Sequence, residues 1–157
     1  MLTFAPVSDR PLLQRTEAQP ACFVCGQSNS GGLRIRFQVA GSGLAKARWK
    51  PGKSLEGFPG IVHGGIVATL LDEAMSKAVS ALGVTALTAE LRVRFRRPVP
   101  SGQELAVEGW VLDRRRRRII VEAAVTGGDG GECAHGWGTF LATSTPAGSP
   151  EQGSGPL

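Results

Sequence analysis

The residues best suited to chemistry in this chain lie in one segment near its middle, residues 60–73, GIVHGGIVATLLDE. Gly64 and Gly65 stand where an apolar helix is expected to begin, and glycine lets a ligand approach the backbone because it has no Cβ. The free N–H groups of a first helical turn lie at the positive end of the helix dipole. This pattern predicts a site for the negative charge that develops on a carbonyl oxygen. The alternative is an ordinary tight turn.

Two carboxylates follow in the same apolar segment. Glu73 has Lys77 four residues later, the spacing of an ion pair on a helix, so we expect an exposed Glu73–Lys77 pair. Asp72 has no such partner and is the better candidate for a general base or a nucleophile. The alternative for Asp72 is a solvated helix face.

The spacing of these residues bears on assembly. Gly64 and Asp72 are eight residues apart, or about 12 Å along a helix. They cannot both reach one carbonyl group within a single chain. If both are catalytic, two antiparallel helices must bring Gly64 of one subunit to Asp72 of another, which predicts a twofold dimer.

The elements that position these residues follow from apolar periodicity. Apolar residues recur at helical spacing after Gly64, and Gly83 ends the pattern, so we expect a helix over 64–82. Alternating apolar and polar residues predict strands over 33–39, 44–49, 91–95, 105–111, 119–125 and 133–143. Their short connections favour antiparallel pairing. One long helix against a curved antiparallel sheet is an α+β domain.

The chain of 157 residues, 41% of them hydrophobic, is the size of one domain. We expect an irregular segment over 1–20, the domain over 21–145 and a disordered tail over 146–157, where little can be buried. No stretch approaches the roughly 20 apolar residues of a membrane span, which excludes a transmembrane protein. Three cysteines and no signal peptide favour the cytoplasm.

Three runs of sequence together resemble a known family: HGGIVATLLDE at 63–73, TAELRVRFRRPVPSG at 88–102 and CFVCGQSNSGGLRIRF at 22–37. They are similar to hotdog-fold acyl-CoA thioesterases of the phenylacetate-degradation type and to their mammalian thioesterase-superfamily relatives. The resemblance covers about residues 21–143. It implies a hotdog fold, a curved antiparallel sheet wrapped around one long central helix. It also implies hydrolysis of an acyl-CoA to a carboxylic acid and free CoA, without a cofactor, by a homodimer or homotetramer.

The resemblance also implies roles for particular residues. The backbone N–H of Gly64 would bind the thioester carbonyl, with Gly65 beside it in the substrate-binding turn. Asp72 would be the general base or nucleophile, Thr88 would orient the water, and His63 would hold the loop. Many relatives carry Asn or Gln six residues before the histidine, where this chain has Gly57 and so lacks a second side-chain donor.

The positive charge of the chain is concentrated. The net charge is +5, and nine of the 18 Lys and Arg residues lie between Arg92 and Arg118. This predicts an anionic partner, either a nucleic acid or a phosphorylated small molecule, unless the face is simply solvated. Aromatic residues are only 6% of the chain and none lies in the run 114–118, which disfavours nucleic acid. The resemblance favours the phosphates of CoA as the partner and leaves open which arginines contact them, with Arg92, Arg94 and Arg96 as the candidate substrate-binding residues.

Cys22 and Cys25 form a Cys-x-x-Cys-Gly sequence that suggests zinc. A zinc site needs four ligands, and no second Cys-x-x-Cys or histidine pair follows. We therefore expect no metal, and interpret the pair as a tight loop that packs small thiols. His135 lies in an expected strand and is interpreted as a packed or surface histidine.

Two alternatives to hydrolysis remain open. The same fold could carry an acyl-thioester hydratase or dehydratase, which would call for an acid–base histidine close to the carboxylate. A non-catalytic acyl-CoA-binding module is the alternative from another class.

Overall fold

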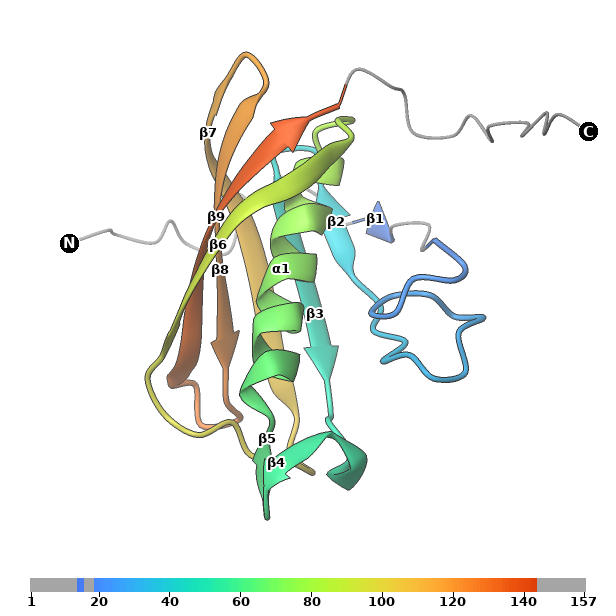
Figure 1. Ribbon diagram of the computed structural model, residues 1–157, viewed down its shortest axis with the longest axis vertical. Helices are drawn as coiled ribbons and strands as arrows, with labels where there is room; N and C mark the ends of the chain where they lie inside the picture. The colour runs from blue at the N-terminus through green and yellow to red at the C-terminus, as the bar shows by residue number, and fades with distance from the viewer. Residues whose placement is uncertain (1–13, 16–18, 144–157) are drawn as a thin grey trace, which may run out of the picture.

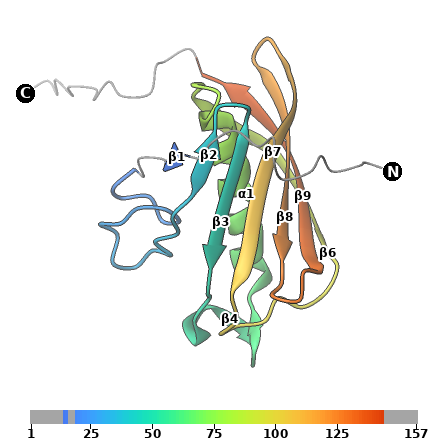
Figure 2. The same ribbon diagram turned by 180° about the vertical axis from the view of Figure 1, so that it is seen from behind.

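The architecture is one long helix packed on one face of a curved antiparallel sheet (Figures 1 and 2). The structure, a computed structural model, describes residues 14–15 and 19–143. The helix is α1 (Gly64–Ser80). The strands are β1 (Gln14–Arg15), β2 (Gln38–Ala40), β3 (Leu44–Trp49), β4 (Glu56–Phe58), β5 (Ile61–Val62), β6 (Ala86–Phe95), β7 (Leu105–Arg115), β8 (Arg118–Thr126) and β9 (Glu132–Ala142), and a 3₁₀ turn, η2 (Lys53–Leu55), precedes β4. The expected α+β arrangement is confirmed.

Seven strands form the main sheet in the order β1-β2-β3-β7-β8-β9-β6, and every neighbouring pair is antiparallel. β6 therefore forms one edge of the sheet, although it follows the helix directly in sequence. The short hairpin of β4 and β5 lies apart from this sheet, where the chain enters α1 (Figure 1). The order places the first turn of α1 and the strand β6 on the same side of the domain.

A row of small residues lets the helix lie directly on the sheet. Ala45, Gly109, Ala123 and Gly136 are paired in register across β3, β7, β8 and β9. A Cβ on Gly109 would lie 2.4 Å from the Ala74 carbonyl oxygen of α1, so no larger residue fits without displacing the helix. The core of the domain is the interface between this face of the sheet and the buried side of α1.

The strand expected over 33–39 is shorter than its pattern suggests. Only β2 (Gln38–Ala40) pairs with β3, whereas the Leu33 N–H donates to the Phe23 carbonyl at 2.8 Å. The first half of the segment thus lies against the preceding loop, with Ile35 buried there. Alternation of apolar and polar residues indicates a half-buried extended segment, but it does not show which neighbouring segment makes hydrogen bonds with its backbone.

The other expected elements are all present, although β6 begins five residues before the expected strand over 91–95 and β7 continues four residues beyond the expected strand over 105–111. The helix expected over 64–82 is α1, which ends at Ser80 before a turn to Gly83 at φ +72°. The five remaining expected strands correspond to β3, β6, β7, β8 and β9. Within the segment expected to be irregular, β1 pairs with β2, while the expected tail over 146–157 lies outside the described residues. No helix in the described residues has the length and apolar character needed to cross a membrane.

Candidate active site

The helix begins at a capped turn that leaves one amide unpaired. His63 is the N-cap of α1, and its Nδ1 accepts the Gly65 N–H at 2.9 Å. The lone pair on Nδ1 is thus occupied, so in the neutral ring the proton is on Nε2. The Gly64 N–H has no acceptor among the described residues. Of the two glycines singled out in the sequence, Gly64 keeps its amide available for a ligand and Gly65 does not.

A cleft of about 450 Å³ lies at this turn. His63 and Gly64 contribute its polar backbone, and Phe58, Val67 and Phe95 contribute apolar surface. A Cβ on Gly64 would lie 3.5 Å from Cζ of Phe95, so the aromatic ring already contacts the turn. The two phenylalanines were not singled out in the sequence, although Phe95 follows Leu91 and Val93 in the alternation of its strand.

Gly57 lies directly against the His63 ring. A Cβ on Gly57 would be 3.2 Å from Cδ2 of His63 and 3.3 Å from its Cα. The Cβ of any side chain at position 57 would therefore lie against His63. The polar group nearest to this place is the imidazole of His63, not an amide side chain.

The second half of the candidate site is Asp72, in the middle of α1. Thr88, on β6, donates its hydroxyl proton to Asp72 Oδ1 at 2.8 Å. Burial raises the pKa of the Asp72 carboxyl above its ordinary value, the Thr88 hydrogen bond lowers it, and the charge of Glu73 raises it further, with a net upward shift. The carboxylate is thus held in place and made more basic than an exposed aspartate.

The two halves of the site do not meet within the chain. His63 and Gly64 lie together at the start of α1, and Asp72 and Thr88 lie together two turns later. Eight residues of helix separate Gly64 from Asp72, about 12 Å. One thioester carbonyl cannot contact both within a single subunit.

The expectation of an exposed ion pair at Glu73 is wrong in one respect. Lys77 Nζ does lie 3.5 Å from Glu73 Oε1, but the two side chains are only 11% and 14% exposed, respectively. The loop that carries Cys22 and Cys25 covers them, because Cys22 Sγ lies 4.0 Å from the same carboxylate oxygen. The spacing of four residues on the helix predicts the Glu73–Lys77 ion pair, but it cannot show that a distant loop covers the pair.

Arg92 and Arg94 lie on β6 opposite Trp137 and His135 of β9, and Arg96 directly follows β6. The Arg92 guanidinium lies 4.6 Å from the Trp137 ring centroid, and Arg96 pairs with Glu132. Arg94 is exposed and has no ion pair within the described residues. Two of these three arginines therefore have partners within the domain, and Arg94 is free to bind an external anion.

Two features singled out in the sequence remain, His135 and the arginine run over 114–118. His135 is half-buried between Glu122 and Glu132, 3.2 and 3.1 Å from their carboxylate oxygens, which confirms a packed histidine. The arginine run is the β7–β8 hairpin, with Arg116 at φ +54° in its turn.

Comparisons with known proteins agree with this fold. The family model for the thioesterase superfamily matches residues 59–134. A protein of Saccharolobus solfataricus described as an esterase is 30% identical over 111 residues, 69% of this chain and 73% of that protein. Acyl-coenzyme A thioesterase THEM4 of Xenopus laevis is 30% identical over 81 residues, 52% of this chain but 36% of that protein, so the chain spans about a third of this relative.

A solved structure shows the same fold. The crystal structure of a thioesterase superfamily protein superposes with a TM-score of 0.73 and 27% identity, covering 77% of this chain and 60% of that chain. The family-model match over residues 59–134 includes the start of α1, Asp72 and the whole of β6. The chain therefore belongs to the thioesterase superfamily and has the hotdog fold.

Proposed function

We propose that the protein hydrolyses acyl-CoA thioesters, releasing a carboxylic acid and free CoA. The observation that carries this proposal is the hydrogen bond from Thr88 to Asp72, which fixes a partly buried, basic carboxylate on the same helix as an unpaired Gly64 amide. Membership of the thioesterase superfamily supplies the reaction class. The THEM4 relative, an acyl-coenzyme A thioesterase by name, supports the choice of CoA.

The chemistry assigns one task to each group. Asp72 accepts a proton from water as the water oxygen attacks the thioester carbonyl carbon. The negative charge that develops on the carbonyl oxygen is stabilised by the Gly64 N–H, by the positive end of the α1 dipole and by the Nε2–H of His63. Collapse of the tetrahedral intermediate breaks the C–S bond, and the CoA thiolate leaves and takes the proton held by Asp72, which regenerates the base. Direct attack by the Asp72 carboxylate, giving an anhydride that water then hydrolyses, would use the same geometry.

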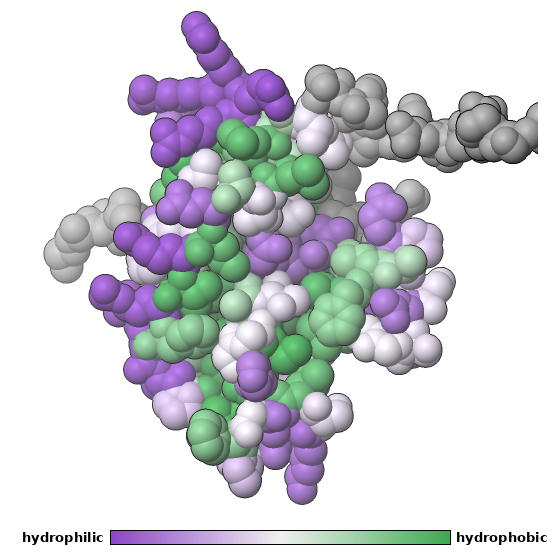
Figure 3. Space-filling model, viewed as in Figure 1, coloured by the Kyte–Doolittle hydropathy of each residue, from purple (hydrophilic) through white to green (hydrophobic). Residues whose placement is uncertain are grey.

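A second copy of the chain would complete the site. Among the strands that the structure describes, β6 has a neighbour on only one side, and Leu87, Leu91 and Phe95 along it are 68%, 36% and 54% exposed. Figure 3 shows hydrophobic surface among polar side chains on the side where β6 and α1 face the viewer. An unpaired edge with apolar side chains favours pairing with another strand. A twofold dimer through β6 would bring the helix start of one subunit toward Asp72 of its partner.

The structure offers less support for a hydratase or dehydratase. That chemistry calls for a histidine beside the carboxylate. The chain has two histidines, of which His63 lies at the start of α1 and His135 lies between two glutamates on β9. Neither contacts Asp72 within one chain. In the proposed dimer His63 would approach the partner's Asp72, but its Nδ1 is already engaged by the Gly65 N–H.

A panel of acyl-CoA esters with a thiol-trapping reagent tests the proposal. The full-length protein should release CoA thiol with at least one member of the panel, and the Asp72→Asn variant should release it far more slowly. Tight binding of an acyl-CoA with no thiol release, or loss of a double bond without thiol release, would instead support the binding module or the hydratase.

Mixing two inactive variants tests the shared site. Asp72→Asn and Gly64→Pro should each be nearly inactive, and a mixture should regain activity once subunits exchange, because a mixed dimer holds one site with both groups intact. Exchange would be followed with fluorescent labels on the two variants. A fully exchanged mixture that stays inactive would show that the two groups act within one subunit or not at all.

A further inference from the structure

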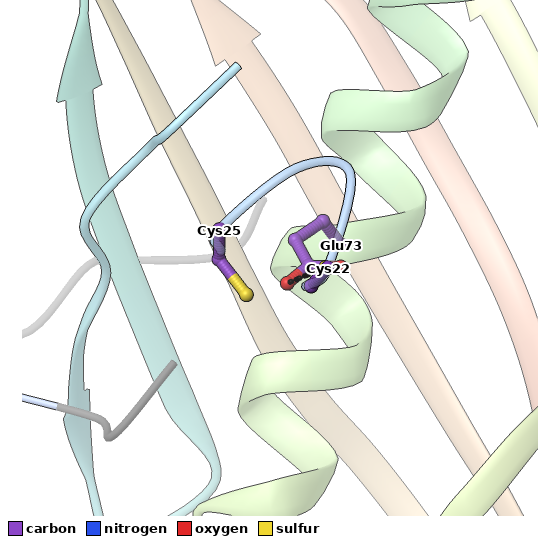
Figure 4. Close-up of side chains that lie close together, drawn as sticks. All are labelled: Cys22, Cys25 and Glu73. Carbon is purple, nitrogen blue, oxygen red and sulfur yellow. Dashed lines mark hydrogen bonds between the residues drawn. The ribbon is translucent and has the colours of Figure 1, made fainter. Parts of the chain in front are cut away.

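Two cysteines and a glutamate from distant parts of the chain converge beside α1. Cys22 and Cys25 come from the loop before β2, and Glu73 comes from the middle of the helix (Figure 4). Their two sulfur atoms and one carboxylate oxygen all lie within 4.8 Å of one another. Cys25 is buried and Cys22 is partly exposed, so one side of the group opens to solvent. These three residues are called the thiol–carboxylate cluster below.

The loop that carries the two cysteines is held by its own backbone. The Gly26 N–H donates to the Cys22 carbonyl at 2.9 Å, and a Cβ on Gly26 would lie 2.5 Å from the Cys22 backbone. On the other side, the Ile35 N–H donates to the Val24 carbonyl at 2.8 Å. The two thiols are therefore presented to Glu73 by a fixed turn, which is the preorganisation that a ligand site requires.

A basic side chain lies beside the cluster. Lys77 Nζ is 3.5 Å from Glu73 Oε1, and both side chains are largely buried. Two thiolates and one carboxylate around a divalent cation leave one net negative charge, which the Lys77 ammonium would cancel.

We propose that Cys22, Cys25 and Glu73 bind one zinc ion, which fastens the loop before β2 to the middle of α1. Two thiolates and a carboxylate are a donor set that zinc accepts in tetrahedral geometry. The fourth position, on the side of the partly exposed Cys22, takes water. Counting cysteines and histidines along the sequence finds only two ligands here, because the third is a glutamate 51 residues after Cys22. The ion has a structural role and takes no part in the proposed hydrolysis.

The test measures metal binding directly. The full-length protein, freed of any purification tag, is reduced, stripped with a chelator and titrated with zinc and separately with cobalt(II). We expect one equivalent of zinc per chain, a higher melting temperature with zinc, and a cobalt spectrum with thiolate charge-transfer and intense tetrahedral bands. Cys22→Ala and Cys25→Ala should abolish the thiolate bands or reduce them strongly. Glu73→Gln should weaken zinc binding by about tenfold or more.

Cys133→Ala is the matched control, since Cys133 is also a buried thiol but lies on β9, outside the cluster. It should bind zinc and cobalt as the unaltered protein does. The proposal is overturned if the reduced unaltered protein takes up no stoichiometric zinc, or if its cobalt spectrum has no thiolate band. It is also overturned if the Cys133 change removes the band and the changes in the loop do not. These readouts do not depend on thioester hydrolysis, and they use the unaltered protein even where a variant fails to fold.

Discussion

Thr88 Oγ1 donates a hydrogen bond to Asp72 Oδ1 across 2.8 Å, and this contact joins the middle of α1 to the edge strand β6. In the described part of the chain it is the only side-chain hydrogen bond between these two elements. One hydroxyl thus sets both the position of the carboxylate and its distance from the free edge of the sheet. The relationship gives the first prediction.

Replacing Thr88 by Val keeps the shape of the side chain and removes the hydroxyl. Asp72 then loses its orienting partner, and we expect kcat/KM for an acyl-CoA to fall by about 10- to 100-fold, the scale of a small misplacement in an active site. Thr88→Ser keeps the hydroxyl and should retain most of the activity. Melting temperatures of both variants would show whether folding is intact. A valine variant as active as the original protein would remove Thr88 from the site.

Asp72→Asn removes the base while keeping the size of the side chain. The expected loss in kcat is about 10²- to 10⁴-fold, the usual contribution of general acid–base catalysis. Asp113→Asn is the matched control, because it makes the same chemical change at an exposed hairpin aspartate. Steady-state rates should separate the two clearly. Equal rates for the two variants would show that the Asp72 carboxylate takes no part in the reaction.

Gly64→Pro tests the unpaired amide at the start of α1. Proline lacks an N–H and is well tolerated at the first helical position. His63 precedes it with ψ 133°, the extended conformation that proline requires of its predecessor. The loss of one oxyanion donor should lower kcat by about 10²- to 10³-fold. Gly64→Ala keeps the N–H and should cost much less, and similar rates for the two variants would argue against an oxyanion role.

Arg94→Gln tests contact with the phosphates of CoA. Arg94 has no ion pair in the described residues, so its replacement breaks no internal bridge. We expect a higher KM for acyl-CoA with kcat nearly unchanged, and no effect on an acyl-pantetheine, which lacks the nucleotide phosphates. Lys50→Gln removes the same charge at another exposed position and should leave KM unchanged. An equal rise in KM for both substrates would speak against phosphate contact.

The pairing of Asp129 with Arg97 predicts a pH-dependent contribution to stability. The Arg97 guanidinium, and then the Gly131 N–H, hold the pKa of Asp129 down to about 2. A depressed pKa stabilises the fold above the unfolded pKa of about 3.9, and the effect is lost as pH falls toward 2. The difference in melting temperature between the original protein and Asp129→Asn should therefore be largest above about pH 4 and shrink toward pH 2. A difference that stays constant with pH would contradict the assignment.

Much of the fold could be predicted because local rules and tertiary packing agree. The helix begins at Gly64 as expected, since apolar spacing and the glycine turn both mark that point. Strand alternation correctly separates Val93 from its neighbours Arg92 and Arg94, because one face of β6 meets the helix and the other does not. The strand expected over 33–39 was only partly correct, because the first half of this segment makes its backbone hydrogen bonds with the loop before it and not with the sheet.

The residue types in the candidate site could be predicted from the sequence, but the contacts between them could be predicted less well. Thr88 was expected to orient the water that Asp72 would activate, and its hydroxyl lies 2.8 Å from Asp72 Oδ1. By contrast, nothing along the chain indicates that Cys22 would lie on Glu73, because a contact across 51 residues depends on where a loop folds back. The hydrogen bond from the Gly65 N–H to the His63 ring also depends on the rotamer of His63, which spacing along the chain does not reveal.

The close seating of α1 on Gly109 has a consequence for the length and path of an acyl group. With the Ala74 carbonyl where a single methyl group on Gly109 would clash, no methylene chain can thread between helix and sheet along that row. In the proposed reaction the acyl group would instead lie against Phe58, Val67 and Phe95, which line the cleft at the first helical turn. In the proposed dimer, the depth of this cleft would be decided by how the two subunits close.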